Sequence, residues 1–243
     1  MFRPMAAAPH GRRVRGDHQL PAGRHGLSAT FVAQNQRQRI MAALAAVTAE
    51  HGYAALTVED VVARAGVSRR TFYDQFSNKH EAFLAAYDQV SNALLAGVRH
   101  AFEDAPTFST KVANGLTAFV QFIVSEPGFS HMCIVDVLGA GPNAIERRNA
   151  VIQAFAQEFE AAAKELGSAP RPLVSETVVG GIHEVVYARL RAGRVDTLPG
   201  LLPDLIYAAI APFCGEEQAE RARLDALAQA DGAGAAAAVS TDV

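Results

Sequence analysis

The sequence contains no tryptophan and only two cysteines, Cys133 and Cys214, among 243 residues. Two cysteines so far apart form neither a disulfide framework nor a zinc-binding pattern, so a reducing cytosol is the simplest setting. No uninterrupted apolar run approaches about 18 residues, and we therefore expect no membrane-spanning helix and no membrane partner. The arginines near the start are not followed by the apolar stretch of a secretory signal. These absences exclude several classes of protein but do not indicate a function.

Charge is unevenly distributed along the chain. Residues 1–80 hold 11 Lys+Arg against 5 Asp+Glu, a net of +6, whereas residues 81–243 hold 11 against 20, a net of −9. A basic end on an acidic body indicates that the first part meets a polyanion. The alternative is that the positive excess belongs only to an arginine-rich leader.

The order of segments predicts an all-α protein. Residues 1–33 are rich in Pro, Gly and Arg without apolar periodicity, so we expect a disordered leader there; an organelle transit peptide is the less favoured alternative. Helical periodicity then predicts a three-helix domain over 34–80 and a helical body over 81–230, followed by a flexible Gly/Ala-rich tail over 231–243. Within these parts, helices are expected at about 58–65, 69–75, from 78 onward, and at 108–125, 129–138, 142–166, 173–192 and 200–213.

Residues 57–79, TVEDVVARAGVSRRTFYDQFSNK, predict a helix–turn–helix. Thr57 is a good N-cap for the first helix, and Gly66 supplies the left-handed residue that ends it. Ser68 then caps a second short helix. One apolar stripe holds the first helix to the core, formed by Val58, Val61, Val62 and Ala65.

The second helix has two distinct faces. Phe72 and Phe76, four residues apart, anchor one face to the core, and the opposite face presents polar and charged groups. Guanidinium groups can pair with guanine O6 and N7, and a threonine methyl can meet the methyl of thymine. This chemistry predicts contact with DNA through Arg69, Arg70, Thr71 and Tyr73, whereas the acid Asp74 has no clear role.

These residues closely resemble the TetR family of bacterial transcription regulators over roughly residues 36–96. The resemblance rests on His51-Gly52-Tyr53, Leu56-Thr57-Val58, Ala65-Gly66-Val67-Ser68, Thr71-Phe72-Tyr73, Phe76 and Lys79. It implies that the helix beginning near Ser68 enters the major groove. The implied base or phosphate contacts are Ser68, Arg69, Arg70, Thr71, Tyr73 and Gln75, and the implied phosphate contacts are Thr57 and Lys79.

The resemblance also implies a ligand-binding and dimerisation role for the body, although ordinary core packing explains most of its apolar residues. Candidate pocket residues are Phe119, Phe122, Ile123, His131, Met132, Phe155, Phe159, His183 and Tyr187, of which the two histidines and the tyrosine are candidate polar contacts. The candidate dimer interface comprises Gly180, Gly181, Leu201, Leu202, Leu205, Ile206, Ala209 and Ile210. Internal packing alone is the alternative for that last set.

Enzymatic signals are weak. Gly139-Ala140-Gly141-Pro142-Asn143-Ala144 imitates a dinucleotide-binding fingerprint, but the segment carrying the required acid is helical. His183-Glu184 lacks the second histidine of a zinc helix, because Tyr187 stands in its place. We therefore expect no enzyme activity, no catalytic residue, no metal and no cofactor.

The sequence thus predicts a cytoplasmic, nucleoid-associated homodimer that binds a roughly palindromic DNA operator and releases it, as a repressor, when a small apolar effector binds. A DNA-binding protein without such a ligand is the first alternative, and a nucleotide-binding enzyme using the Gly139–Gly141 turn is the second. The leader could add minor-groove contacts.

Overall fold

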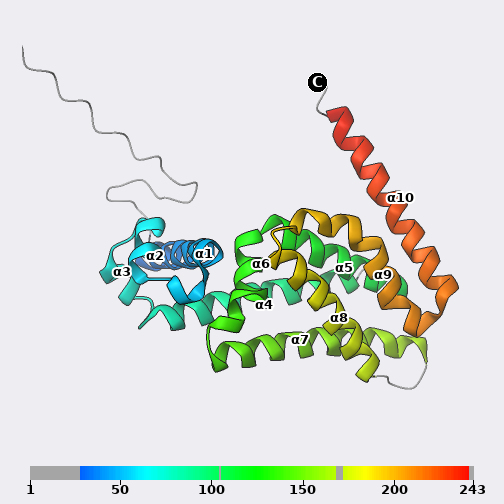
Figure 1. Cartoon of the computed structure of the whole chain (residues 1–243), viewed down its shortest axis with the longest axis horizontal. Coiled ribbons are helices and arrows are strands. Elements are labelled where there is room, and N and C mark those ends of the chain that lie inside the picture. The colour runs from blue at the N-terminus through cyan, green and yellow to red at the C-terminus, as the bar shows by residue number, and fades with distance from the viewer. Residues whose placement is uncertain (1–27, 104, 168–171, 241–243) are drawn as a thin grey trace, which may run out of the picture.

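The computed structural model describes residues 28–103, 105–167 and 172–240, with side chains up to residue 230. Over these ranges the chain forms helices and no strand, which confirms the all-α prediction. Figure 1 shows an elongated molecule with the first three helices at one end and the C-terminal helix leaving the body at the other. Residues 1–27 of the predicted leader lie outside the described residues.

The first helix, α1 (Ala29–Ala55), begins earlier than expected, inside the segment assigned to the leader. Ser28 caps it, because the side chain of Ser28 accepts a hydrogen bond from the backbone N–H of Phe31 at 3.1 Å. Gly52, with φ of 77°, kinks the helix near its end. A residue with a side chain would be strained in that conformation, and the kink turns the chain toward the helix–turn–helix.

The helix–turn–helix forms as predicted, from α2 (Val58–Ala65) and α3 (Arg69–Tyr73). The hydroxyl of Thr57 accepts from the backbone N–H of Asp60 at 3.2 Å, and that of Ser68 accepts from the N–H of Thr71 at 3.0 Å. Gly66 adopts the left-handed conformation, with φ of 63°, that ends α2. The local sequence therefore determines both ends of this motif.

The body consists of seven further α-helices and three short 3-10 helices within the described ranges. They are α4 (Lys79–Glu103), α5 (Phe108–Ser125), α6 (Pro127–Ile134), η1 (Asp136–Gly139), α7 (Pro142–Ala163), η2 (Lys164–Leu166), α8 (Pro172–Arg191), η3 (Val195–Thr197), α9 (Leu198–Cys214) and α10 (Glu216–Ser240). The helix α10 continues to Ser240 where we expected a flexible tail; residues 241–243 lie outside the description. Because the segment before Pro142 is α6 and η1 rather than a strand, the dinucleotide-binding alternative lacks its structural context.

One continuous core joins the first three helices to the body. It includes Ile40 and Leu44 of α1, Phe72 of α3, Phe83 of α4 and Met132 of α6, each at most 1% exposed. The helix α4 is the shared element, since it begins beneath the helix–turn–helix and runs through the body (Figure 1). A displacement of α4 within the body would therefore also move α1, which packs on it, and with α1 the helices α2 and α3.

The stretch Val195–Cys214, which contains η3 and α9, is long and apolar enough to cross a membrane by length and composition alone. The expectation of no such segment overlooked it because Asp196 and Asp204 interrupt the apolar run. In the structure α9 packs against α5, α8 and α10, so it is part of the body of the protein. Leu201, Leu202, Tyr207 and Phe213 of α9 are half-buried and pack against the apolar core of the body.

Candidate nucleic-acid interface and internal cavity

The outward display of α3 rests on two phenylalanines. Phe72 is 0% exposed and Phe76 is 2% exposed, and their ring centroids lie 5.8 Å apart. A helix of five residues is not stable alone, so this buried pair holds it on the core. The predicted anchoring role of both residues is thus seen directly.

Two arginines of α1 brace the motif from behind. The guanidinium of Arg37 lies 4.3 Å from the centroid of the Phe76 ring, and its Nη1 donates to the carbonyl of Gln75 at 3.3 Å. The Nη2 of Arg39 donates to the carbonyls of Ala65 and Gly66, the latter at 2.9 Å. These contacts satisfy carbonyls at the ends of α2 and α3. Sequence reasoning missed both roles because it counted these residues with the charge of the leader.

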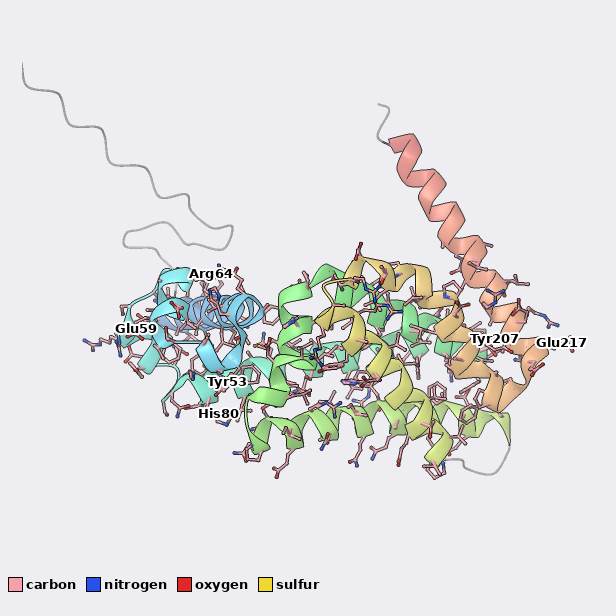
Figure 2. The ribbon with its side chains drawn as sticks, viewed as in Figure 1. Tyr53, Glu59, Arg64, His80, Tyr207 and Glu217 are labelled. Atoms are coloured by element: carbon pink, nitrogen blue, oxygen red, sulfur yellow. The ribbon has the colours of Figure 1, made fainter. Side chains whose placement is uncertain are left out.

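The face of α3 that points away from the core carries exposed Arg69, Arg70 and Tyr73, the last 49% exposed. Arg69 forms an ion pair with Glu59 of α2, and its Nη2 lies 3.5 Å from the hydroxyl of Tyr73. Glu59 lies at the outer end of the molecule in Figure 2. Arg70 forms no ion pair with any residue in the described ranges, so its guanidinium is available to an external anion.

The remaining predicted contacts are more engaged within the protein. Thr71 is half-buried and its hydroxyl lies 2.9 Å from that of Ser68, while Gln75 is half-buried beside Arg37. The hydroxyl of Thr57 donates to the carboxylate of Asp60 at 2.5 Å. Asp74 is exposed at the C-terminal end of α3. The side chains of Ser68 and Thr57 therefore act first as helix caps.

The ammonium of Lys79 contacts groups within the protein, whereas we expected it to contact a DNA phosphate. This ammonium donates to the carbonyl of Leu56 at 2.7 Å and lies 3.5 Å from that of Tyr53, and it sits 5.1 Å from the centroid of the Tyr53 ring. The side chain thus turns inward and caps the end of α1 from the first turn of α4. Within the described chain the principal partners of this ammonium are backbone carbonyls, and the expected phosphate contact stays a prediction.

A second contact reinforces this junction between α1 and α4. The hydroxyl of Tyr53 lies 3.1 Å from Nδ1 of His80. Both residues are labelled in Figure 2, at the end of the molecule that carries the helix–turn–helix. The Tyr53 ring also packs edge-on against Phe83, with centroids 4.9 Å apart. Burial raises the pKa of the Tyr53 hydroxyl. The start of α4 is thereby fixed to the end of α1.

The comparisons with known proteins agree with this architecture. The family described as "Bacterial regulatory proteins, tetR family" matches residues 40–86, which include α2 and α3 and the start of α4. The chain is 29% identical over 109 residues to the transcriptional activator FasR of Mycolicibacterium smegmatis, a match covering 45% of this chain and 50% of FasR. Residues 40–86 therefore form a helix–turn–helix domain of the kind found in TetR-family transcription regulators.

Two further similarities extend over the body. The regulator EthR of Mycolicibacterium smegmatis is 23% identical over 196 residues, covering 79% of this chain and 89% of EthR. The solved structure of FadR from Bacillus subtilis in complex with stearoyl-CoA superposes with a TM-score of 0.65 at 16% identity, covering 73% of this chain and 98% of that one. The likeness to the FadR structure therefore extends beyond the helix–turn–helix to the fold of the body.

The body contains a partly open cavity of about 120 Å³ between α4, α5, α7 and α8, with two residues contributed by α6. Its wall is mostly apolar, as in small-molecule sites. The apolar lining comprises Leu94, Val98, Phe102, Val112, Gly115, Leu116, Phe119, Ile134, Val151, Ile152, Phe155, Phe159, Val179 and Ile182. The polar and ionisable lining comprises Tyr87, Ser91, Cys133, Arg148, Glu158 and His183.

Four of the nine pocket residues predicted from sequence line this cavity: Phe119, Phe155, Phe159 and His183. The other five lie elsewhere. Met132 belongs to the core beneath α1, and Ile123 belongs with Phe122 and Tyr187 to a separate apolar cluster. Nδ1 of His131 lies 2.8 Å from the carboxylate of Asp136, so His131 is engaged on η1 rather than in the cavity.

Burial perturbs three ionisable side chains around the cavity. Desolvation lowers the pKa of His183 to about 4, with a smaller effect of the positive charge of Arg148, so the imidazole is neutral at pH 7. Desolvation also raises the pKa of Tyr87 well above its ordinary value and raises the pKa of Cys133 to about 12. The thiol is therefore protonated and unreactive, and the cavity contains no activated nucleophile among these groups.

The predicted dimer-interface residues divide into two sets. Leu205, Ile206, Ala209 and Ile210 are at most 7% exposed within the single chain and form its own core with α5 and α10. Burial in the chain removes these four from any surface. Leu201, Leu202 and Gly180 are half-buried and Gly181 is exposed, so the accessible part of the predicted interface is narrower than expected.

Proposed function

We propose that this TetR-family regulator is a homodimeric repressor that binds a roughly palindromic operator through α3 and leaves it when a small molecule occupies the cavity. One observation supports this proposal. The long helix α4 begins next to the outward-facing α3 and, farther along, lines the mostly apolar cavity.

Base recognition falls to the exposed side chains of α3. Arg70 is exposed and has no ion-pair partner in the described ranges, and Arg69 and Tyr73 flank it, so this face offers both bidentate donors and a phosphate-binding hydroxyl. The N-cap ends at Thr57 and Ser68 place backbone N–H groups toward phosphate. Thr71 and Gln75 complete the surface from half-buried positions.

Dimerisation supplies the second recognition helix. Leu201 and Leu202 of α9 are half-buried within one chain, and Gly181 of α8 is exposed beside half-buried Gly180. Small residues let another helix approach closely, so a second copy packed on α8 and α9 would cover this face. Two-fold symmetry would then separate the two α3 helices by about 34 Å, one turn of DNA.

Release follows from differential binding. Tyr87, Leu94 and Phe102 of α4 line the cavity, and Lys79 and His80 at the start of the same helix hold the end of α1. A ligand that prefers one position of α4 thereby changes the spacing of the two α3 helices. Reversing occupancy from 99:1 to 1:99 requires about 5.5 kcal/mol of differential affinity. The FadR complex with stearoyl-CoA is a precedent for a fatty-acyl ligand on this fold.

The test is to map the chain's binding sites across its genome and to measure affinity for the recovered duplex across increasing salt. We expect inverted half-sites one helical turn apart and an affinity that falls steeply as salt rises. Binding that ignores salt, or sites without internal symmetry, would contradict the proposal. Operator binding that no cavity ligand alters would instead indicate a DNA-binding protein without an effector.

A further inference from the structure

The wall of the cavity contains two charged side chains, Arg148 and Glu158, and they differ in their partners. Arg148 and Glu158 both lie on α7, where α7 turns one face to the cavity through Val151, Ile152 and Phe155. Ten residues of helix separate the backbone positions of Arg148 and Glu158 by about 15 Å along the axis of α7. The cavity therefore has one cationic end and one acidic end, with apolar wall between them.

Glu158 is neutralised within the protein. Its carboxylate accepts a hydrogen bond from Nε of Arg99 on α4 at 2.7 Å, and the pair forms an ion pair. Arg148 has no carboxylate partner in the described ranges. Its Nη1 donates to the side-chain oxygen of Asn149 at 3.0 Å, and its Nη2 lies 3.4 Å from Nδ1 of His183.

The Nε–H of Arg148 is shielded from solvent and has no hydrogen-bond partner among the residues that the structure describes. A shielded donor on a charged group is costly to leave unsatisfied, so an anion at this position would recover that cost. Carboxylates match the guanidinium particularly well, because two parallel N–H donors can meet two oxygens. The unpaired Nε–H of Arg148 thus indicates that the cavity suits a ligand with an anionic group.

His183 adds a second donor beside it. Since a guanidinium only donates, Nδ1 of His183 must be the acceptor facing Arg148, and the proton of the neutral ring is then on Nε2. Tyr87 and Ser91 of α4 also line this end. Besides Arg148, the donors at this end of the cavity are the Nε2–H of His183 and the hydroxyls of Tyr87 and Ser91, which suit an anionic head group.

We propose that the cavity binds an amphipathic carboxylate, with the carboxylate on Arg148 and His183 and an unbranched apolar chain extending along α7 toward Glu158. This assignment rests on the proposed function, whose effector it specifies by chemical class. The reverse orientation is unfavourable, because Arg99 at the far end is already paired with Glu158 and is not available to a second carboxylate.

The inference is tested by calorimetry on the full-length protein without DNA, using dodecanoate, dodecanol and dodecanoyl-CoA. We expect dodecanoate to bind at least tenfold more tightly than dodecanol, since a charge-assisted hydrogen bond distinguishes them. Decanoate should bind about fourfold more weakly per methylene removed. Equal binding of acid and alcohol, or tighter binding of the thioester, would overturn the assignment.

Variants locate the head group. Arg148→Met should remove the preference for dodecanoate over dodecanol, whereas Arg221→Gln, which alters an exposed arginine of α10, should leave it unchanged. A preference that survives Arg148→Met refutes the assignment. Should Arg148→Met fail to fold, as judged by circular dichroism, the comparison of acid with alcohol on the unmodified protein still decides.

Failure of the inference and failure of the proposed function are separate results. If dodecanoate binds through Arg148 but operator affinity is unchanged, the regulatory proposal fails and the assignment of the ligand class stands. If a neutral apolar compound releases the operator while dodecanoate does not bind, the assignment fails and ligand-responsive regulation stands.

Discussion

Lys79 distinguishes a contact inside the protein from a contact with DNA. The TetR resemblance assigns this residue to a phosphate, whereas the structure places its ammonium 2.7 Å from the carbonyl of Leu56 at the junction of α1 and α4. Lys79→Met keeps most of the aliphatic stem and removes the charge and its donors. The two roles predict different results for this one substitution.

The magnitude follows from what the ammonium holds. A hydrogen bond to a charged group contributes about 1.5–3 kcal/mol, and the half-buried position of Lys79 reduces this to about 1–2 kcal/mol. For a chain of this size we expect Lys79→Met to lower Tm by about 2–8 °C. Because no phosphate contact is lost, the slope of log affinity against log salt should stay as in the unmodified protein.

The assay combines thermal unfolding with operator titrations at several salt concentrations. Arg69→Gln is the matched control, since Arg69 is exposed on the outer face of α3 and its removal should lower the magnitude of the salt slope by about one with little effect on Tm. The reasoning is refuted if Lys79→Met lowers the slope by about one and leaves Tm unchanged.

Three further predictions concern the two sites. Arg70→Ala should weaken operator binding by about 1–3 kcal/mol and relax the preference at one base pair in a panel of mutated duplexes; an equal loss on all duplexes would mean that Arg70 contacts phosphate only. Phe72→Ala should lower the free energy of unfolding by about 3–5 kcal/mol in urea denaturation, because the ring is 0% exposed, and a loss below 1 kcal/mol would contradict its anchoring role. The folded protein holds the pKa of His183 near 4, below its ordinary value of 6.5, so the unfolded chain binds the proton more tightly and stability should fall as pH decreases from 6.5 to 4. His183→Gln should flatten that part of the pH profile, and an unchanged profile would exclude His183 as the cause.

The helix–turn–helix was predictable because its determinants are local. The N-caps at Thr57 and Ser68, the left-handed Gly66 and the spacing of Phe72 and Phe76 each act within four residues of sequence. Local signals of this kind determine where a helix begins, where it ends and which side is buried. They do not determine the contacts made by long side chains, and so the inward course of Lys79 and the bracing by Arg37 were not foreseen.

The cavity was only partly predictable, because its wall depends on how helices far apart in sequence face one another. A search for aromatic and histidine side chains found Phe119 and His183 but not Arg148, whose charge resembles that of an ordinary exposed arginine. A signal was present in the spacing of Arg148 with Val151, Ile152 and Phe155, which repeats at three and four residues and places the charge on the apolar stripe of α7. A charge within such a stripe indicates a site more specifically than another phenylalanine does.

Arg148 also has a direct neighbour that connects the cavity to α4. Arg147, the preceding residue of α7, pairs through Nε with both carboxylate oxygens of Asp88, at 2.9 and 3.1 Å. Asp88 follows Tyr87, which lines the cavity, on the same turn of α4. A ligand that draws Arg148 toward a head group must therefore move α7 and α4 together or break this pair. Since Lys79 and His80 fix the start of α4 to α1, the shift is delivered to the base of the helix–turn–helix rather than absorbed in the body. Asp88→Asn should then weaken the coupling between ligand and operator while leaving both separate affinities nearly unchanged, and coupling that stays the same would place the connection elsewhere on α4.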